Sequence, residues 1–177
     1  YTENDILDII YNNFSSEILD VFTKTNSYEL KKYIGCLCIL FVRGGIFINH
    51  DIEMIEDFNM PLGKKLAVFR NVSSVNSNPW AINPSVIQSA PMNREIRLSI
   101  EMIKINIKIS NDKKIKYCEL VSDIIGRSMA IIYSQDEYWC GETIRIIGNK
   151  LGSFALISPN GKMIAQQIRP FEESGRA

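Results

Sequence analysis

The sequence predicts an α/β layered domain that ends in a small β extension. Helical and strand-like segments alternate through most of the chain, and such alternation is typical of helices packed on a sheet. Short apolar runs separated by turn residues dominate the last part, which favours strands there. The chain has 177 residues, 46% hydrophobic and 23% charged, so a single domain with a real core is expected.

The charge balance excludes one class of partner. Lys and Arg together number 20, as do Asp and Glu, so the formal net charge is zero at pH 7. A nucleic-acid-binding protein needs a surplus of cations for its phosphate contacts, and no such partner is expected here. A small phosphate site stays compatible with neutrality, because a few local donors or a metal ion are enough to form one.

The first helical region covers residues 2–22, where apolar side chains recur at helical spacing. Thr2 and Asp5 form a loose capping box at its start. The polar pair Ser15 and Ser16 interrupts the pattern, so we expect two helices rather than one.

The next helix is expected over residues 28–42. Lys31 and Lys32 are predicted to be exposed near its start, and the later residues are apolar on nearly all sides. A helix that is apolar all round is buried, here against a sheet. Gly44 and Gly45 are expected to end it, since glycine is common just past a helix.

The rest of the chain predicts short strands and two more helices. Residues 72–84 predict a loop that carries Trp80. Asn160 and Gly161, between two apolar runs, predict a β-hairpin. Helices are expected at residues 93–109 and 117–129, and strands at 66–70, 81–83, 130–133, 143–147, 154–157 and 163–168, with a turn or short strand at 85–90.

Cysteine, histidine and apolar content limit other possibilities. The four cysteines include no CxxC pair and there is a single histidine, so buried free thiols are expected rather than a zinc site. The longest apolar stretch, residues 33–42, is too short to span a membrane and is not placed like a signal peptide. We therefore expect a soluble chain, in the cytoplasm or the secretory lumen.

The most informative local feature is the segment 44–53, with the sequence GGIFINHDIE. Two glycines precede a short run of strong β preference, and a polar cluster follows it. Side-chain alternation in an extended segment would place Asn49, Asp51 and Glu53 on one side and direct His50 away from Asp51. Carboxylates at the C-terminal end of a strand in a parallel sheet suit a divalent cation that holds a diphosphate.

Simpler roles stay open for the same residues. A helix C-cap would also explain Gly44 and Gly45. A solvated strand end would also explain Asp51 and Glu53. Trp80 suits either stacking on a sugar or base, or packing over the core.

The segment 44–53 resembles the sugar-nucleotide-binding region of glycosyltransferase family 32 (Och1-like), which contains a DXD motif. The family pattern is an apolar helix, Gly-Gly-Ile-Tyr, an apolar residue, and Asp-x-Asp followed by an aliphatic residue. The resemblance implies a GT-A-type Rossmann-like fold and transfer of a sugar, with retention, from a nucleotide-diphosphate donor to a glycan or other hydroxyl acceptor. It also implies Mn²⁺ or Mg²⁺, and residues 1–177 would form one domain that lacks the family's first strand.

Carried over by position, the resemblance assigns donor binding to Gly44 and Gly45 and metal binding to Asp51. Asn49 stands where the family has its first Asp, and the resemblance makes it the second metal ligand. An amide keeps a neutral oxygen but supplies no charge, so weakened metal binding is expected. Glu53 is also a donor-binding candidate.

Further departures support an alternative function. The family's donor-binding Asp and Arg align with Tyr33 and Cys36, which cannot replace them. Asp123 is the nearest candidate for a catalytic residue by position, and Trp80 is a candidate for donor binding. The alternative is a catalytically inactive glycosyltransferase-like protein that binds or assembles with a partner. A structural α/β protein with a coincidental Gly-Gly-x-Phe segment is a third possibility.

Overall fold

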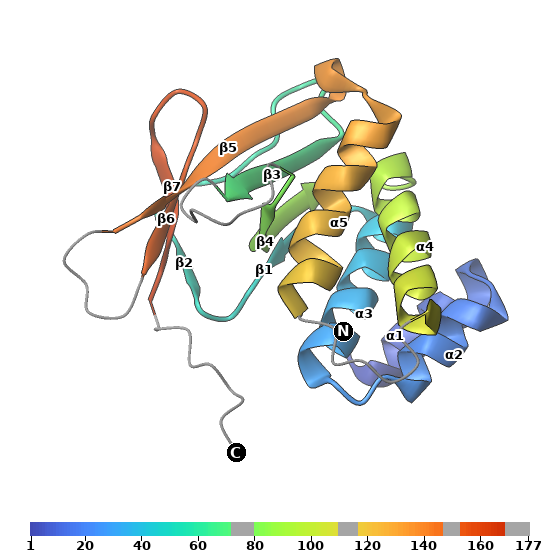
Figure 1. Ribbon diagram of the computed structural model, residues 1–177. Coiled ribbons are helices and arrows are strands. Elements are labelled where there is room, and N and C mark those ends of the chain that lie inside the picture. Colours follow the sequence, from blue (N-terminus) through green and yellow to red (C-terminus); the bar gives the residue numbers. More distant parts are fainter. Residues whose placement is uncertain (72–79, 110–116, 147–152, 169–177) are drawn as a thin grey trace.

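The computed structural model describes residues 1–71, 80–109, 117–146 and 153–168 (Figure 1). In these ranges a layer of helices covers one side of a seven-stranded mixed sheet. The mixed α/β architecture agrees with the layered domain predicted from the sequence, including strands in the last part of the chain.

The first helices confirm the predicted break and the predicted capping box. The backbone N–H of Asp5 donates to Oγ1 of Thr2 at 3.3 Å, and the backbone N–H of Thr2 donates to Oδ2 of Asp5 at 2.7 Å. Each of these bonds satisfies an N–H group that a helix start leaves without a partner. The helices are α1 (Glu3–Asn13), α2 (Ser16–Lys24) and α3 (Tyr28–Arg43).

Helix α3 is the buried helix that the sequence predicts, but its two lysines are not exposed as expected. The side chains of Lys31 and Lys32 are only 27% and 20% exposed. Lys31 lies over the ring of Phe22, with its Nζ 5.1 Å from the ring centre, because a lysine stem packs well on apolar surface. The helix ends at Gly44, whose φ of 67° favours glycine.

The sheet is mostly antiparallel, which corrects the parallel edge expected at residues 44–53. The strand order is β1-β4-β3-β5-β6-β7-β2, and β3 with β5 is the parallel pair among the described strands. The strands are β1 (Gly45–Ile48), β2 (Ile52–Met54), β3 (Leu66–Asn71), β4 (Ile82–Ser89), β5 (Tyr138–Arg145), β6 (Phe154–Ile157) and β7 (Met163–Gln167).

Some element types differ from the sequence prediction. Helix α5 (Tyr117–Ile132) includes most of the predicted strand 130–133, and the N–H of Tyr133 still bonds the carbonyl of Met129 at 2.9 Å. The predicted strand at 81–83 and the predicted turn or short strand at 85–90 are one strand, β4. Helix α4 (Arg94–Ile109) and the hairpin at Gly161, with φ of 82°, are confirmed. Residues 72–79 of the predicted loop 72–84 lie outside the described residues.

The sheet is curled, so that the end of one edge strand lies near the start of the other. Strands β1 and β2 occupy opposite edges, yet residues 49–51 alone connect them. The four Cα-to-Cα steps from Ile48 to Ile52 span at most about 15 Å. Figure 1 shows this short connection below the sheet. We call residues 49–51 the junction.

Two apolar cores lie on the two faces of the curled sheet. The larger core joins α1 to α5 to the face formed by side chains such as Leu66, Val68 and Ile87. The smaller core lies inside the curl and includes Phe69 and Val86. The aromatic rings of Phe58, Phe69 and Trp139 pack there with centroids 5.0 to 5.6 Å apart.

The prediction of buried free thiols is confirmed for two of the cysteines that the structure describes. Cys36 and Cys38 are buried and free, and Cys140 is half-buried and free. Burial raises the pKa of the Cys38 thiol to about 12, so it stays protonated at neutral pH. The side chain of Cys118 lies outside the described residues. Within the described part of the chain, no helix has the length and apolar character needed to cross a membrane.

Candidate functional site

The junction is a turn held at both ends by the sheet edges it joins. The N–H of Asn49 donates to the carbonyl of Ser85 in β4 at 2.8 Å, and the N–H of Ile168 donates to the carbonyl of Asp51 at 2.9 Å. Within the turn, the N–H of Ile52 donates to the carbonyl of Asn49 at 3.1 Å. The segment is therefore not the continuous extended strand that the alternation argument assumed.

This turn separates two carboxylates that the sequence placed together. Nε2 of Gln167 donates to Oδ2 of Asp51 at 3.0 Å, whereas Nε2 of Gln166 donates to Oε2 of Glu53 at 2.9 Å. Consecutive residues of β7 point to opposite faces of the sheet. The partners of Asp51 and Glu53 therefore lie on opposite faces of the sheet. This corrects the prediction that Asn49, Asp51 and Glu53 share one side.

The side-chain oxygen of Asn49 is the centre of the polar contacts at the junction. Nζ of Lys32 lies 3.2 Å from Oδ1 of Asn49, and the backbone N–H of His50 donates to the same oxygen at 3.1 Å. Nδ1 of His50 is 3.2 Å away, so the exposed imidazole lies beside Asn49. Lys32 also forms an ion pair with Glu29 at 2.5 Å, one turn earlier in α3.

Asp51 carries a buried oxygen without a described partner. Its Oδ2 accepts from Gln167, but its Oδ1 is buried and has no hydrogen bond among the described atoms. A buried acceptor without a partner costs about 1–3 kcal/mol. A hydrogen bond donated to Oδ1 would recover that cost, so this oxygen keeps unused capacity to accept.

The described residues do not form a ready metal centre. No group of three His, Cys, Asp or Glu side chains suited to a metal ion occurs in the described ranges. Oδ1 of Asp51 fits a cation, but Oδ1 of Asn49 already faces the Lys32 ammonium at 3.2 Å. A divalent ion bound to that amide oxygen would be repelled by the neighbouring positive charge.

The glycine pair lies at the opposite end of β1 from the junction. A Cβ on Gly44 would approach Cδ of Pro91 to 2.8 Å and the carbonyl oxygen of Ser89 to 2.9 Å, so close packing as well as φ requires glycine. Gly45 and Asn49 are separated by about 13 Å along the strand. The structure therefore gives Gly44 a helix-ending and packing role.

Trp80 and Asp123 belong to a neighbouring region where α5 meets the start of β4. A Cβ on Gly126 would lie 1.8 Å from the carbonyl oxygen of Trp80, so the two backbones are in close contact. Asp123 lies one turn before Gly126 on the same face of α5 and is half-buried. The indole of Trp80 is 48% exposed. No described contact connects either side chain to Asn49.

The two helix positions that depart from the family pattern are core positions. Tyr33 is 2% exposed, and its hydroxyl donates to the carbonyl of Pro84 at 2.9 Å. Cys36 is 7% exposed, and burial raises the pKa of its thiol. Both side chains stabilise the packing of α3 on the sheet instead of lining an open site.

Sequence reasoning missed two residues that contact the junction. Lys32 lies 17 positions before Asn49 and was expected to be exposed, and Gln167 lies 116 positions after Asp51. Neither has a local motif that signals its contact. The sequence shows only that Lys32 lies in the predicted helix directly before Tyr33, and this does not predict a contact with Asn49.

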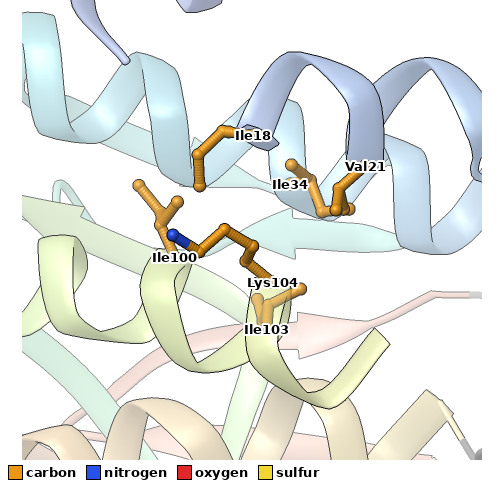
Figure 2. Close-up of a pocket in the computed structure, with 6 residues that line it drawn as sticks. All are labelled: Ile18, Val21, Ile34, Ile100, Ile103 and Lys104. Atoms are coloured by element: carbon orange, nitrogen blue, oxygen red, sulfur yellow. The ribbon is translucent and has the colours of Figure 1, made fainter. Parts of the chain in front are cut away.

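A small cavity lies away from the junction, among α2, α3 and α4 (Figure 2). Its volume is about 10 Å³, and the lining is apolar apart from Lys104, whose aliphatic stem lies beside Ile103. That volume is about one water molecule, far below what a nucleotide needs. The cavity is therefore a packing defect and is too small to bind a sugar-nucleotide donor.

Comparison with known proteins shows a similarity of fold to a solved structure. No family model matches the chain, and no curated protein matches it. Among solved structures, the fold is similar to "PaToxG Glycosyltransferase", with a TM-score of 0.51 and 15% identity. The match covers 66% of this chain and 41% of that one, so this chain spans less than half of that protein. At such identity the similarity shows a shared fold and leaves membership of family 32 a prediction.

Proposed function

We propose that this chain belongs to a glycosyltransferase that moves a sugar from a nucleotide-diphosphate donor to a hydroxyl acceptor. The observation that carries the proposal is the junction, where Asn49, His50 and Asp51 present polar groups between the two edge strands of the sheet. The similarity of the fold to a glycosyltransferase structure supports it. The choice of a nucleotide-diphosphate sugar as donor rests on the resemblance of the segment 44–53 to glycosyltransferase family 32.

The residues of the junction divide the work of donor binding. The unpartnered Oδ1 of Asp51 accepts a hydrogen bond from a ribose or sugar hydroxyl. The exposed imidazole of His50 lies beside Asn49 and is available to polar groups of the donor. Positive groups that stabilise the departing diphosphate make the largest contribution in such a transfer, because negative charge develops there.

Retention at the anomeric carbon and assistance by Mn²⁺ or Mg²⁺ remain predictions of the resemblance, as do the donor-binding roles of Gly44, Gly45, Glu53 and Trp80 and the catalytic role of Asp123. If a metal ion bound here, Asp51 would be the residue to hold it, and the ion would supply positive charge for the donor phosphates. The described residues do not fit a preassembled metal centre, and we therefore derive no step through a metal ion.

Calorimetric titration tests the proposal. The full chain is titrated with UDP- and GDP-sugars, with Mn²⁺ and with EDTA, as wild type and as Asp51→Asn. The Asn variant keeps an acceptor for Gln167 but no longer has the carboxylate, so affinity is expected to fall about tenfold. Asp57→Asn, an exposed carboxylate six residues later, is the matched control and is expected to bind like wild type. Absence of heat with every donor would overturn the proposal.

A catalytically inactive binding or assembly protein is the second candidate. The observation that favours it is the burial of Tyr33 and Cys36, where the family pattern has donor-binding side chains. A hydrolysis assay separates the two candidates. Release of UDP or GDP from a donor sugar by wild type, lost in Asp51→Asn and kept in Asp57→Asn, would exclude the inactive alternative.

A further inference from the structure

We infer that Lys32 is the cationic group that binds the diphosphate of the donor, so that donor binding at the junction does not depend on a metal ion. This inference rests on the proposed function and specifies how that site holds its anion. The contact between Nζ of Lys32 and Oδ1 of Asn49, at 3.2 Å, fixes the ammonium at the junction.

The position of Lys32 suits an anion-binding group. Its side chain is 20% exposed, which leaves the ammonium accessible while the stem is packed. Glu29 and Asn49 hold the ammonium in place, and the ring of Tyr28 lies 5.9 Å from it. An ammonium has three N–H donors, so a further acceptor can bind without releasing Asn49. Lysine is a common phosphate ligand because it acts as a compact point charge.

The junction lacks the charge that would favour a metal instead. Its amide, Asn49, replaces a carboxylate of the family pattern, and the amide oxygen accepts from Lys32 and from the His50 backbone. The amide removes a negative charge and the Lys32 ammonium contributes a positive one, so both make the local charge more positive. Both changes weaken a cation site and strengthen a diphosphate site.

The acidic groups near Lys32 determine how strongly an anion binds. Glu29 competes directly, since it pairs with Lys32 at 2.5 Å, but its side chain is 44% exposed and can move into water. Asp51 and Glu53 are bound by Gln167 and Gln166. A diphosphate therefore displaces Glu29, while the two other carboxylates keep their own partners.

Two opposite substitutions test the role of Lys32. The probes are inorganic pyrophosphate and UDP-glucose, titrated into the full chain in EDTA. Lys32→Met should weaken binding about tenfold, and Lys32→Arg should restore most of it. Glu29→Gln should strengthen binding about threefold, because it removes the competing carboxylate. Lys31→Met removes the same charge one residue earlier, where the lysine pairs with Glu3, and should bind like wild type.

The outcomes separate this inference from the proposed function. Binding of UDP-glucose that requires Mn²⁺ and is equal in Lys32→Met and Lys31→Met would overturn the inference and leave the proposed function standing. Pyrophosphate binding that depends on Lys32, without binding of any nucleotide sugar, would overturn the proposed function and the donor role with it. Unchanged or weaker binding in Glu29→Gln, with the fold verified by circular dichroism, would contradict the competition on which the inference depends.

Discussion

Gly126 is the single residue on which the contact between α5 and the start of β4 most directly depends. The carbonyl oxygen of Trp80 lies 1.8 Å from the position of a Cβ at Gly126, and a backbone atom cannot move away as a flexible side chain does. Gly126 is a buried residue of the helix. The usual cost of glycine in a helix is therefore offset here by close packing.

Substitution Gly126→Ala should destabilise the fold in spite of the higher helix propensity of alanine. The propensity gain is about 1 kcal/mol, whereas overpacking against a fixed backbone costs about 1–3 kcal/mol and displaces Trp80 as well. Because a 1.8 Å approach places the overpacking cost near the upper end of that range, we expect a net loss of about 1–2 kcal/mol in the free energy of unfolding, measured by denaturant titration.

The neighbouring Arg127→Ala is the matched control, because Arg127 is exposed on the same helix. Its free energy of unfolding should stay within about 0.5 kcal/mol of wild type. A Gly126→Ala variant as stable as Arg127→Ala would show that the Trp80 backbone yields easily, contrary to the close contact.

Single residues also show where the sequence was sufficient for the site and where it was not. The sequence located Asn49 and Asp51 at the end of a strand, because glycines, β-forming residues and polar residues follow one another locally. It could not locate Lys32 or Gln167, since their contacts join positions 17 and 116 residues away. The sequence also predicted the wrong side of the sheet for Glu53. That prediction assumed an extended segment, whereas residues 49–51 form a turn.

At the scale of elements, the start of α4 depends on Asn93. Its Oδ1 accepts from the N–H of Ile96 at 2.9 Å, and its backbone carbonyl accepts from the N–H of Arg97 at 3.1 Å. Asn93 is 4% exposed, so water cannot replace the cap readily. The side chain therefore satisfies one N–H group of the first helical turn.

Substitution Asn93→Ala should lower the free energy of unfolding by about 1–2 kcal/mol, since it removes a buried cap. Asn93→Ser provides an acceptor of equal capping preference and should recover most of that loss. Thermal or denaturant unfolding followed by far-ultraviolet circular dichroism measures both. Equal destabilisation by Ala and Ser would indicate that the hydrogen bond from Nδ2 of Asn93 to the carbonyl of Lys65, at 3.4 Å, matters more than the cap.

The elements that the sequence predicted correctly have strong local signals, and the others do not. The break between α1 and α2 follows from Ser15 and Ser16, and the hairpin follows from Asn160 and Gly161. The residues 130–133 are a short apolar run, and such a run fits a strand or a buried helix equally well. Helix α5 extends through Ile132 because its backbone bonding continues to Tyr133. Strand β2 was missed because its three residues form no pattern of their own.

The whole molecule depends on a sheet whose centre is buried and whose edge strands are joined by the junction. The sequence predicted the layers, because alternation of helices and strands is visible along the chain. It could not predict the strand order, in which β1 and β2 are three residues apart in the chain but at opposite edges. That order is fixed by long-range pairing, such as Leu66 with Tyr138 in the parallel pair of β3 and β5.

This arrangement predicts a hierarchy of hydrogen exchange across the sheet. Residues Leu66 to Phe69 of β3 are 0% exposed and lie between two strands, so their amides should exchange only through global unfolding. Strand β1 pairs on one side alone among the described strands, and Ile46 and Ile48 are 40% and 38% exposed. Its amides should exchange through local opening, with lower protection. Native-state exchange at increasing denaturant measures both, and protection of β1 equal to that of β3, with the same denaturant dependence, would show that the junction ties the edges into one cooperative unit.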